Sequence, residues 1–141
     1  MRPMSAEELW AFLRDGARTA VLATVRADGR PHAAPIWYAV DGEQLVFTTW
    51  HTTVKAANLR RDPRVCLLVD DEAPPFAFVQ VEGLATLSED LAELRRWAAL
   101  IGGRYMGADQ AEAYGARNGV PGELLVRVTP TRIVAQAEIA L

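Results

Sequence analysis

The sequence predicts an α+β protein whose centre is an antiparallel β-barrel of about seven strands, with helices mostly at its edges. Two Asp-Gly pairs, Asp28-Gly29 and Asp41-Gly42, each separate two strand-like segments and are typical of tight hairpin turns. A single helical segment interrupts the series of strands that follows. Together these features predict an antiparallel meander.

The first third of the chain is predicted to form one helix and three strands. Ser5 and Glu8 have the spacing of a capping box, and apolar residues recur at helical spacing directly after them. Residues 17–26, 31–40 and 43–50 are rich in strand-forming residues and are joined by the two Asp-Gly turns. We therefore expect three consecutive antiparallel strands after the first helix.

The middle of the chain contains the helix that interrupts the meander. Apolar and small residues at helical spacing predict it over residues 52–61, and Asp62-Pro63 ends it. Residues 64–70 form a nearly continuous apolar run, which predicts a strand buried on both faces. Residues 76–88 alternate as one long strand, in which Gly83 indicates a β-bulge.

The last third of the chain is predicted to form two helical pieces and two strands. Apolar residues over 91–101 follow helical spacing, and residues 108–117 form a second helical piece. Residues 123–128 and 131–137 favour two final strands, separated by Pro130, which cannot donate to a ladder.

Length and charge limit the possible classes of protein. The chain has 141 residues, half of them hydrophobic, which predicts a single domain over residues 1–141. Its net charge of −3 argues against nucleic acid as a partner, since that binding depends on clustered cations. No apolar run reaches the roughly 20 residues of a membrane span, and no secretory signal is evident. We expect a cytoplasmic protein without a membrane partner.

Cysteine and lysine usage gives two further expectations. Cys66 is the only cysteine, so no intrachain disulfide can form, and with two histidines it cannot complete a structural zinc site. We expect Cys66 to be a small core residue and expect no metal site. Fourteen of the fifteen cationic side chains are arginine and alanine is abundant, which suggests a GC-rich, actinobacterial source.

The segment from Thr48 to Arg60 has the composition of an anion site. A strand that ends in hydroxyl residues leads into a helix whose first turn carries Lys55, the only lysine of the chain. Free N–H groups at a helix start, the hydroxyls of Thr49 or Thr53 and one cation suit a phosphate dianion. Arg60 lies further along, where it can serve a longer anionic tail. The alternative is that Thr52 or Thr53 only caps the helix and that Lys55 is a solvated surface charge.

The strand before this segment can form a flat wall. Residues 31–38 place small residues beside aromatic ones, as a planar ring packed against a strand requires. The alternative is an ordinary barrel wall with Trp37 in the core. His32 and His51 are each more often hydrogen-bonded strand histidines than catalytic acids, and no catalytic residue is assigned.

Five segments, in this order, resemble a known superfamily. They are Ala20–Thr24, Asp28–His32, Pro35–Tyr38, Lys55–Val65 and Val79–Ala85. They are similar to the pyridoxamine 5′-phosphate oxidase-like split β-barrel proteins, known as FMN-binding split barrels. The resemblance is to the branch of F420-dependent oxidoreductases that includes biliverdin reductases. Arg104–Gly107 with Ala111–Tyr114 resembles the helical insert of that branch.

The resemblance implies a homodimer with two cofactors at the subunit interface. It implies that Thr49, Thr53 and Lys55 hold the cofactor phosphate with support from Asn58. It further implies that the cofactor ring is lined by Pro35, Ile36 and Trp37, contacted by the backbone of Thr48, and covered by Phe76 and Phe78 of the partner chain.

The resemblance also implies a function. The expected activity is that of an F420-dependent oxidoreductase, which transfers a hydride from reduced deazaflavin to an electron-poor unsaturated small molecule. Three alternatives stay open. One is an FMN-binding oxidoreductase on the same fold, and another is a non-catalytic protein that binds deazaflavin, flavin, haem or another planar ligand. The third is a purely structural or partner-binding barrel, in which the aromatic residues only form the core.

Overall fold

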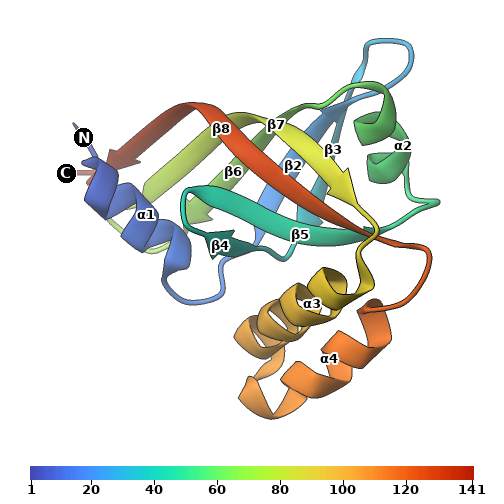
Figure 1. The fold of residues 1–141 in the computed structure, drawn as a ribbon. Helices are drawn as coiled ribbons and strands as arrows, with labels where there is room; N and C mark the ends of the chain where they lie inside the picture. The colour runs from blue at the N-terminus through green and yellow to red at the C-terminus, as the bar shows by residue number, and fades with distance from the viewer.

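An eight-stranded antiparallel sheet organises the chain in the computed structural model, which describes residues Met1–Leu141. The strand order is β3-β2-β6-β7-β8-β5-β4, and β1 pairs with β8. The edge strands β3 and β4 are separated in the chain only by Trp37 and Tyr38, so the curled sheet brings its two edges together at this corner, but no pairing between β3 and β4 closes the barrel (Figure 1). This arrangement is the predicted antiparallel split β-barrel with peripheral helices.

Eight strands and four α-helices make up the barrel and its surroundings. The strands are β1 (Arg2–Pro3), β2 (Ala20–Val25), β3 (Pro31–Ile36), β4 (Ala39–Asp41), β5 (Gln44–Trp50), β6 (Arg64–Asp71), β7 (Ala77–Ser88) and β8 (Glu123–Ala137). The helices are α1 (Ala6–Arg14), α2 (Val54–Arg61), α3 (Leu91–Met106) and α4 (Ala111–Asn118). In Figure 1, α1 lies beside the two termini, whereas α2 lies at the other end of the barrel.

The core fills the inside of the barrel with one face of each strand. Leu22, Phe47, Leu67, Val81 and Val126 are among its fully buried residues and come from five strands. Their alternation with exposed neighbours follows from the two-residue period of a strand. A smaller cluster packs α3 against β5 and β8. The sheet is therefore covered by α3 on the outside of β5 and β8.

The last strand differs from the prediction of two strands separated by Pro130. β8 is continuous from Glu123 to Ala137 and runs through the proline. Pro130 lies opposite Gly83, where the register between β7 and β8 shifts. A Cβ atom on Gly83 would lie 2.6 Å from the Thr129 carbonyl oxygen. The predicted bulge at Gly83 is confirmed, and it is the irregularity that accommodates a residue without an N–H.

Two other predicted strands also differ from the structure. The strand predicted over residues 31–40 is divided into β3 and β4 by Trp37 and Tyr38. Within one protomer, the strand predicted at 64–70 to be buried on both faces is buried on one face only. β6 buries Val65, Leu67 and Val69, but Leu68 points outward and is 38% exposed. A continuous run of apolar residues can therefore form a strand that has one face exposed to solvent.

An apolar surface results on the outside of β2, β6 and β7. Val21 and Leu68 lie opposite each other in the ladder between β2 and β6, and Leu84 lies on β7 opposite Arg64. Their exposed fractions are 43%, 38% and 46%. We call these three residues the outer apolar face.

All four helices are predicted by the sequence, but α3 extends five residues beyond the predicted 91–101, and α4 begins at Ala111 after a 3₁₀ turn at Ala108–Gln110. Ser5 and Glu8 form both hydrogen bonds of the capping box at the start of α1. Helix α3 ends at Gly107, whose φ of 110° suits only glycine. α3 and α4 form a hairpin in which a Cβ atom on Gly102 would lie 2.3 Å from Cβ of Tyr114. No helix has the length and apolar character needed to cross a membrane.

Candidate functional site

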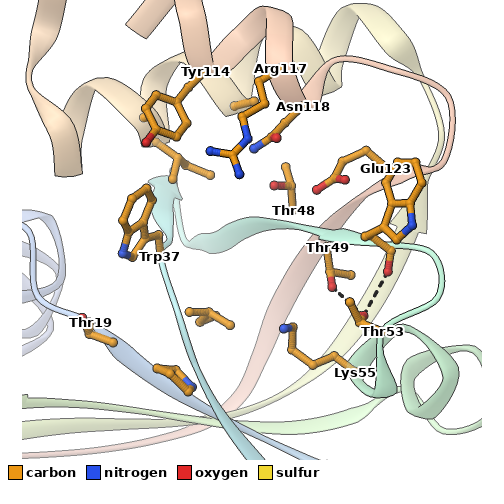
Figure 2. A pocket seen from close by; sticks show the side chains of 16 residues that line it. Thr19, Trp37, Thr48, Thr49, Thr53, Lys55, Tyr114, Arg117, Asn118 and Glu123 are labelled. Atoms are coloured by element: carbon orange, nitrogen blue, oxygen red, sulfur yellow. Dashed lines mark hydrogen bonds between the residues drawn. The ribbon is translucent and has the colours of Figure 1, made fainter. Parts of the chain in front are cut away.

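A cavity of about 530 Å³ lies at the end of the barrel where α2, α3 and α4 approach the sheet. Its walls come from the ends of β3 and β5, the start of α2, the inner sides of α3 and α4, and the first residue of β8 (Figure 2). Its volume lies within the range typical of small-molecule and cofactor sites. Most of the predicted site residues meet here.

Seven of the eleven predicted cofactor-binding residues line this cavity. They are Pro35, Ile36, Trp37, Thr48, Thr49, Thr53 and Lys55. Three elements that are separate in the sequence, β3, β5 and α2, therefore contribute to one site. The hydroxyl and cationic residues come from β5 and α2, and the apolar residues come from β3 and the residue that follows it.

Thr53 organises the anion-binding end of the cavity. It is the N-cap of α2, where its Oγ1 accepts a hydrogen bond of 3.2 Å from Ala56 N–H and donates one of 3.0 Å to the Trp50 carbonyl. The hydroxyls of Thr49 and Thr53 lie 2.8 Å apart and share a hydrogen bond (Figure 2). The N–H groups of Val54 and Lys55 are left without an intrachain partner. A helix start with two free N–H donors and an adjacent ammonium group is suited to bind an oxyanion.

Asn58 and Arg60 lie outside this cavity and have other partners. Asn58 is 4% exposed, and its Nδ2 donates a hydrogen bond of 3.0 Å to Oγ1 of Thr24, which ties α2 to β2. Arg60 donates one of 2.9 Å to the His51 carbonyl. Both residues thus hold α2 and the turn before it in place, rather than facing the cavity.

Phe76 and Phe78 lie far from the cavity within the same chain. Phe78 pairs with Gln136 at one end of the ladder between β7 and β8, whereas Ser88 pairs with Leu125 at the end near the cavity. Phe76 precedes β7, adopts a φ of 66° and is exposed. Within one protomer, neither ring contacts the site.

Trp37 forms a flat aromatic wall rather than part of the core. It is 39% exposed, so the alternative that places it in the core is wrong. Its ring stacks on Tyr105 with centroids 5.0 Å apart and an interplanar angle of 4°. Tyr105 is fixed in turn, because its hydroxyl donates a 2.7 Å hydrogen bond to the Arg18 carbonyl. The ring centroids of Tyr114, on α4, and Trp37 lie 6.0 Å apart.

α4 and β8 contribute three polar residues to the cavity that the sequence did not predict. Arg117, Asn118 and Glu123 line the cavity above the hydroxyl pair, as Figure 2 shows. The available signal was their position on both sides of a glycine-containing turn, Gly119–Gly122, but nothing local linked that turn to the anion site. The α3–α4 hairpin brings them there.

Glu123 is the most unusual group in the cavity. Its residue is only 9% exposed, and it forms no salt bridge. Burial raises the pKa of its carboxyl above the ordinary value, while the Thr48 hydroxyl and the charges of Arg117 and Lys55 oppose that rise. A buried carboxylate beside two cations is thus part of the predicted anion site.

The remaining titratable side chains have structural partners or lie elsewhere. Burial raises the pKa of Tyr38 to about 12, and its hydroxyl donates a hydrogen bond of 2.8 Å to the Leu13 carbonyl. His51 Nδ1 lies 2.9 Å from the Gly122 carbonyl oxygen. Burial also raises the pKa of the Cys66 thiol, which opposes a role as a nucleophile. No cluster of three or more potential metal ligands is present.

The fold is that of a split-barrel protein, and its cavity combines hydroxyl, N–H and cationic groups with an aromatic wall. Residues 5–137 match the family Pyridoxamine 5′-phosphate oxidase. The chain belongs to this family, which includes oxidoreductases.

Three solved structures illustrate the range of similar proteins. A conserved hypothetical protein from Mycobacterium tuberculosis is 31% identical, with a TM-score of 0.84 over 96% of this chain and 86% of that one. An F420 reductase is 28% identical, with a TM-score of 0.69 over 94% of this chain and 98% of that one. The haem storage protein HutZ from Vibrio cholerae is 22% identical, with a TM-score of 0.74 over 98% and 100%. The last of these shares the fold alone.

Proposed function

We propose that the protein is an oxidoreductase that binds the deazaflavin F420 and reduces an electron-poor unsaturated small molecule. The proposal rests on one observation: two half-sites, one suited to bind an oxyanion and one suited to pack against a planar ring, line the same cavity. The hydroxyl pair, the free N–H groups and Lys55 form an oxyanion site, and the wall of Pro35, Ile36 and Trp37 accepts a planar ring.

Each half-site has a distinct task in this proposal. When bound, the reduced cofactor supplies a hydride to the substrate. Lys55 and the start of α2 hold the phosphate, while Trp37, fixed by its stack on Tyr105, orients the ring. Ile101 and Gly102 of α3 close the apolar side and exclude water. No side chain of this chain has to act as a nucleophile.

The choice of F420 over FMN rests on two observations. A 28% identical neighbour that matches over nearly the whole of both chains is an F420 reductase. The α3–α4 hairpin corresponds in position to the helical insert that resembles the F420-dependent branch, and it contributes Tyr114 and Arg117 to the cavity. FMN is the second candidate, because an oxyanion site and an aromatic wall suit either ring.

We further propose that the active form is a homodimer. The outer apolar face of Val21, Leu68 and Leu84 exposes large hydrophobic side chains on one side of the sheet. Exposed large hydrophobic side chains on one face of a sheet are a feature of interaction sites. Phe76 and Phe78, which lie far from the cavity of their own chain, are then available to cover the cavity of the partner.

Fluorescence titration of the ligand-free protein with F420 and, separately, with FMN tests the proposal. We expect micromolar or tighter binding of F420 and much weaker binding of FMN. A preference for FMN would move the protein to the flavin-dependent oxidoreductases, and binding of neither would contradict the proposal.

The catalytic and dimeric parts of the proposal need two further measurements. Oxidation of reduced F420 in the presence of enones, quinones or tetrapyrroles distinguishes a reductase from a non-catalytic carrier, which would bind tightly without turnover. Sedimentation of the same preparation is expected to give twice the 15.5 kDa mass of one chain.

A further inference from the structure

Glu123 is a buried carboxyl group of the cavity to which the proposed function gives no task. Its residue is 9% exposed and lines the cavity from the first position of β8. It forms no salt bridge within the chain. Burial of an ionised carboxyl without a paired cation is costly, whereas burial of a protonated carboxyl costs much less. The cavity therefore contains an acidic side chain whose surroundings favour the form that carries a proton.

The strands place this carboxyl on a different side of β5 from the oxyanion half-site. Glu123 pairs with Trp50 in the ladder between β5 and β8, and its carboxyl interacts with the Thr48 hydroxyl. Because side chains alternate along a strand, Thr49 points to the other face of β5, where its hydroxyl meets that of Thr53. Figure 2 shows Glu123 level with Thr48, and the hydroxyl pair below, near the start of α2. A phosphate held by the hydroxyl pair thus leaves the carboxyl free to act on another part of the cavity.

Glu123 is the residue of the cavity that is best suited to give up a proton. The titratable residues that line the cavity are Lys55, Tyr114, Arg117 and Glu123. Ammonium and guanidinium groups release protons only far above neutral pH, and a phenol is a much weaker acid than a carboxyl group. The residues that α3 contributes to the lining are all uncharged. A proton donor among the lining residues is therefore expected to be this carboxyl.

Reduction of an electron-poor C=C bond requires a proton as well as a hydride. Addition of a hydride to an enone leaves an enolate, and the reaction is complete when the enolate carbon receives a proton. We propose that Glu123 is the general acid that supplies this proton. Its O–H bond breaks as a C–H bond forms on the substrate, and the carboxylate then recovers a proton from solvent. The hydride carries both electrons, so Glu123 transfers a proton alone. This inference rests on the proposed function, which supplies reduced F420 as the hydride donor.

An anion in the oxyanion half-site strengthens the hold of Glu123 on its proton. Burial favours the protonated carboxyl, whereas the charges of Arg117 and Lys55 favour the ionised one. A phosphate bound to Lys55 offsets one of these charges and adds a negative charge to the same cavity, so the protonated form gains. His51, whose Nδ1 lies 2.9 Å from the Gly122 carbonyl oxygen, is a further titratable neighbour. Binding of the cofactor should therefore be coupled to uptake of a proton by Glu123.

The first test measures the protons that are taken up when the cofactor binds. Calorimetric titration with F420 in buffers of different ionisation enthalpy gives this number at each pH between about 5 and 9. Near the pH of the largest effect, we expect wild type to take up about half a proton more than Glu123→Gln. Ionisations of F420 and of His51 are common to both proteins and cancel in the comparison. Glu43→Gln removes an exposed carboxylate at the far end of β5 and is expected to match wild type.

The second test compares two hydride acceptors that differ in their need for a proton. Cyclohexenone needs one, whereas the cationic dye methylene blue becomes neutral when it accepts a hydride and needs none. With both substrates saturating, Glu123→Gln is expected to lower kcat for cyclohexenone about 100-fold and to leave kcat for methylene blue within about threefold of wild type. Glu123→Asp, which retains a carboxyl group, should recover part of the cyclohexenone activity. The fall of that kcat with rising pH in wild type should be absent from Glu123→Gln.

Three outcomes would contradict the assignment of the proton to Glu123. The first is equal proton uptake by wild type and Glu123→Gln at every pH. The second is an equal effect of Glu123→Gln on the two acceptors, in a variant whose binding of F420 shows that it is folded. The third is loss of cyclohexenone turnover in Tyr114→Phe but not in Glu123→Gln, which would assign the proton to Tyr114. Each of these leaves the proposed function intact. If wild type does not bind F420, or reduces neither acceptor, the proposed function fails and the inference fails with it.

Discussion

Two clusters of charged residues, each of which includes a residue of β8, differ in how they are paired. In the first, which we call the paired cluster, Arg127 of β8 forms salt bridges with Asp41 at 2.7 Å and with Glu93 at 3.4 Å. Its guanidinium also lies 5.4 Å from the Trp97 ring. In the second, the cavity cluster of Lys55, Arg117 and Glu123, no salt bridge forms.

The difference distinguishes charges used for structure from charges available to a ligand. Arg127 connects β8 to β4 through Asp41 and to α3 through Glu93, so its interactions are complete within the chain. The cavity cluster instead lines an open volume, and within it Glu123 is buried, Lys55 is half-buried and Arg117 is exposed. An unpaired buried charge such as that of Glu123 is costly unless a partner arrives. We infer that the first cluster stabilises the packing of α3 and that the second awaits a ligand.

The largest expected effect is that of Lys55→Ala on ligand affinity. Loss of one charge-assisted hydrogen bond to the phosphate is expected to weaken cofactor binding about 30-fold, or about 2 kcal/mol. Turnover of the bound complex and the free energy of unfolding should change little, because Lys55 has no salt bridge to lose. Arg26→Ala, which removes an exposed cation from the β2–β3 turn, is the control and should leave affinity unchanged. Equal affinity in wild type and Lys55→Ala would remove this lysine from the site.

Arg127→Met should lower the stability of the protein and leave cofactor affinity nearly unchanged, which is the opposite of what we expect for Lys55→Ala. The expected change in free energy is also smaller. The variant keeps an apolar stem over Trp97 but loses both salt bridges, so we expect the free energy of unfolding to fall by about 1 kcal/mol. Cofactor affinity should stay within about twofold of wild type. Urea denaturation and fluorescence titration measure the two quantities. A loss of affinity without a loss of stability would contradict the assignment of Arg127 to structure.

The smallest expected effect is the pH dependence of stability that Glu123 causes. Because its pKa is raised in the folded state, the folded protein holds this proton at pH values where the unfolded chain has released it. The associated stability is complete below the ordinary pKa of 4.5 and is lost as the pH rises through the folded-state value. Glu123→Gln has no charge to gain, so its stability relative to wild type should increase as the pH rises above the ordinary carboxyl pKa of 4.5. A difference independent of pH, or a similar trend in Glu43→Gln, which removes an exposed carboxylate from the β4–β5 turn, would contradict this.

Much of the fold could be predicted because its signals are local. The capping box at Ser5, the Asp-Gly turns and the bulge at Gly83 each depend on a few neighbouring residues, and each is present. The predictions failed where a contact between distant segments compensated for a residue that is locally unfavourable. Pro130 does not end a strand, because the bulge at Gly83 removes the need for its missing N–H.

The candidate site was predicted only in part, and the part found was the contiguous one. Thr48, Thr49, Thr53 and Lys55 lie within one strand–helix connection, so their shared chemistry can be read in order along the chain. Arg117 and Glu123 were missed because they lie on both sides of a turn that has no anion-binding signal of its own. Conversely, Asn58 has the right place in the sequence but faces β2 instead of the cavity.

By itself, the sequence determined the types and order of most elements and the oxyanion half-site, since hydrogen bonding, turn chemistry and helix capping act between near neighbours. Only the tertiary structure decided which residues complete that site. The α3–α4 hairpin packs closely at Gly102 and thereby carries Tyr114 and Arg117 to the cavity. The pairing of β5 with β8 places Glu123 opposite Trp50 and beside Thr48 in the cavity. These are contacts between segments distant in the chain, and burial and pairing across the whole fold, rather than local preference, bring them together.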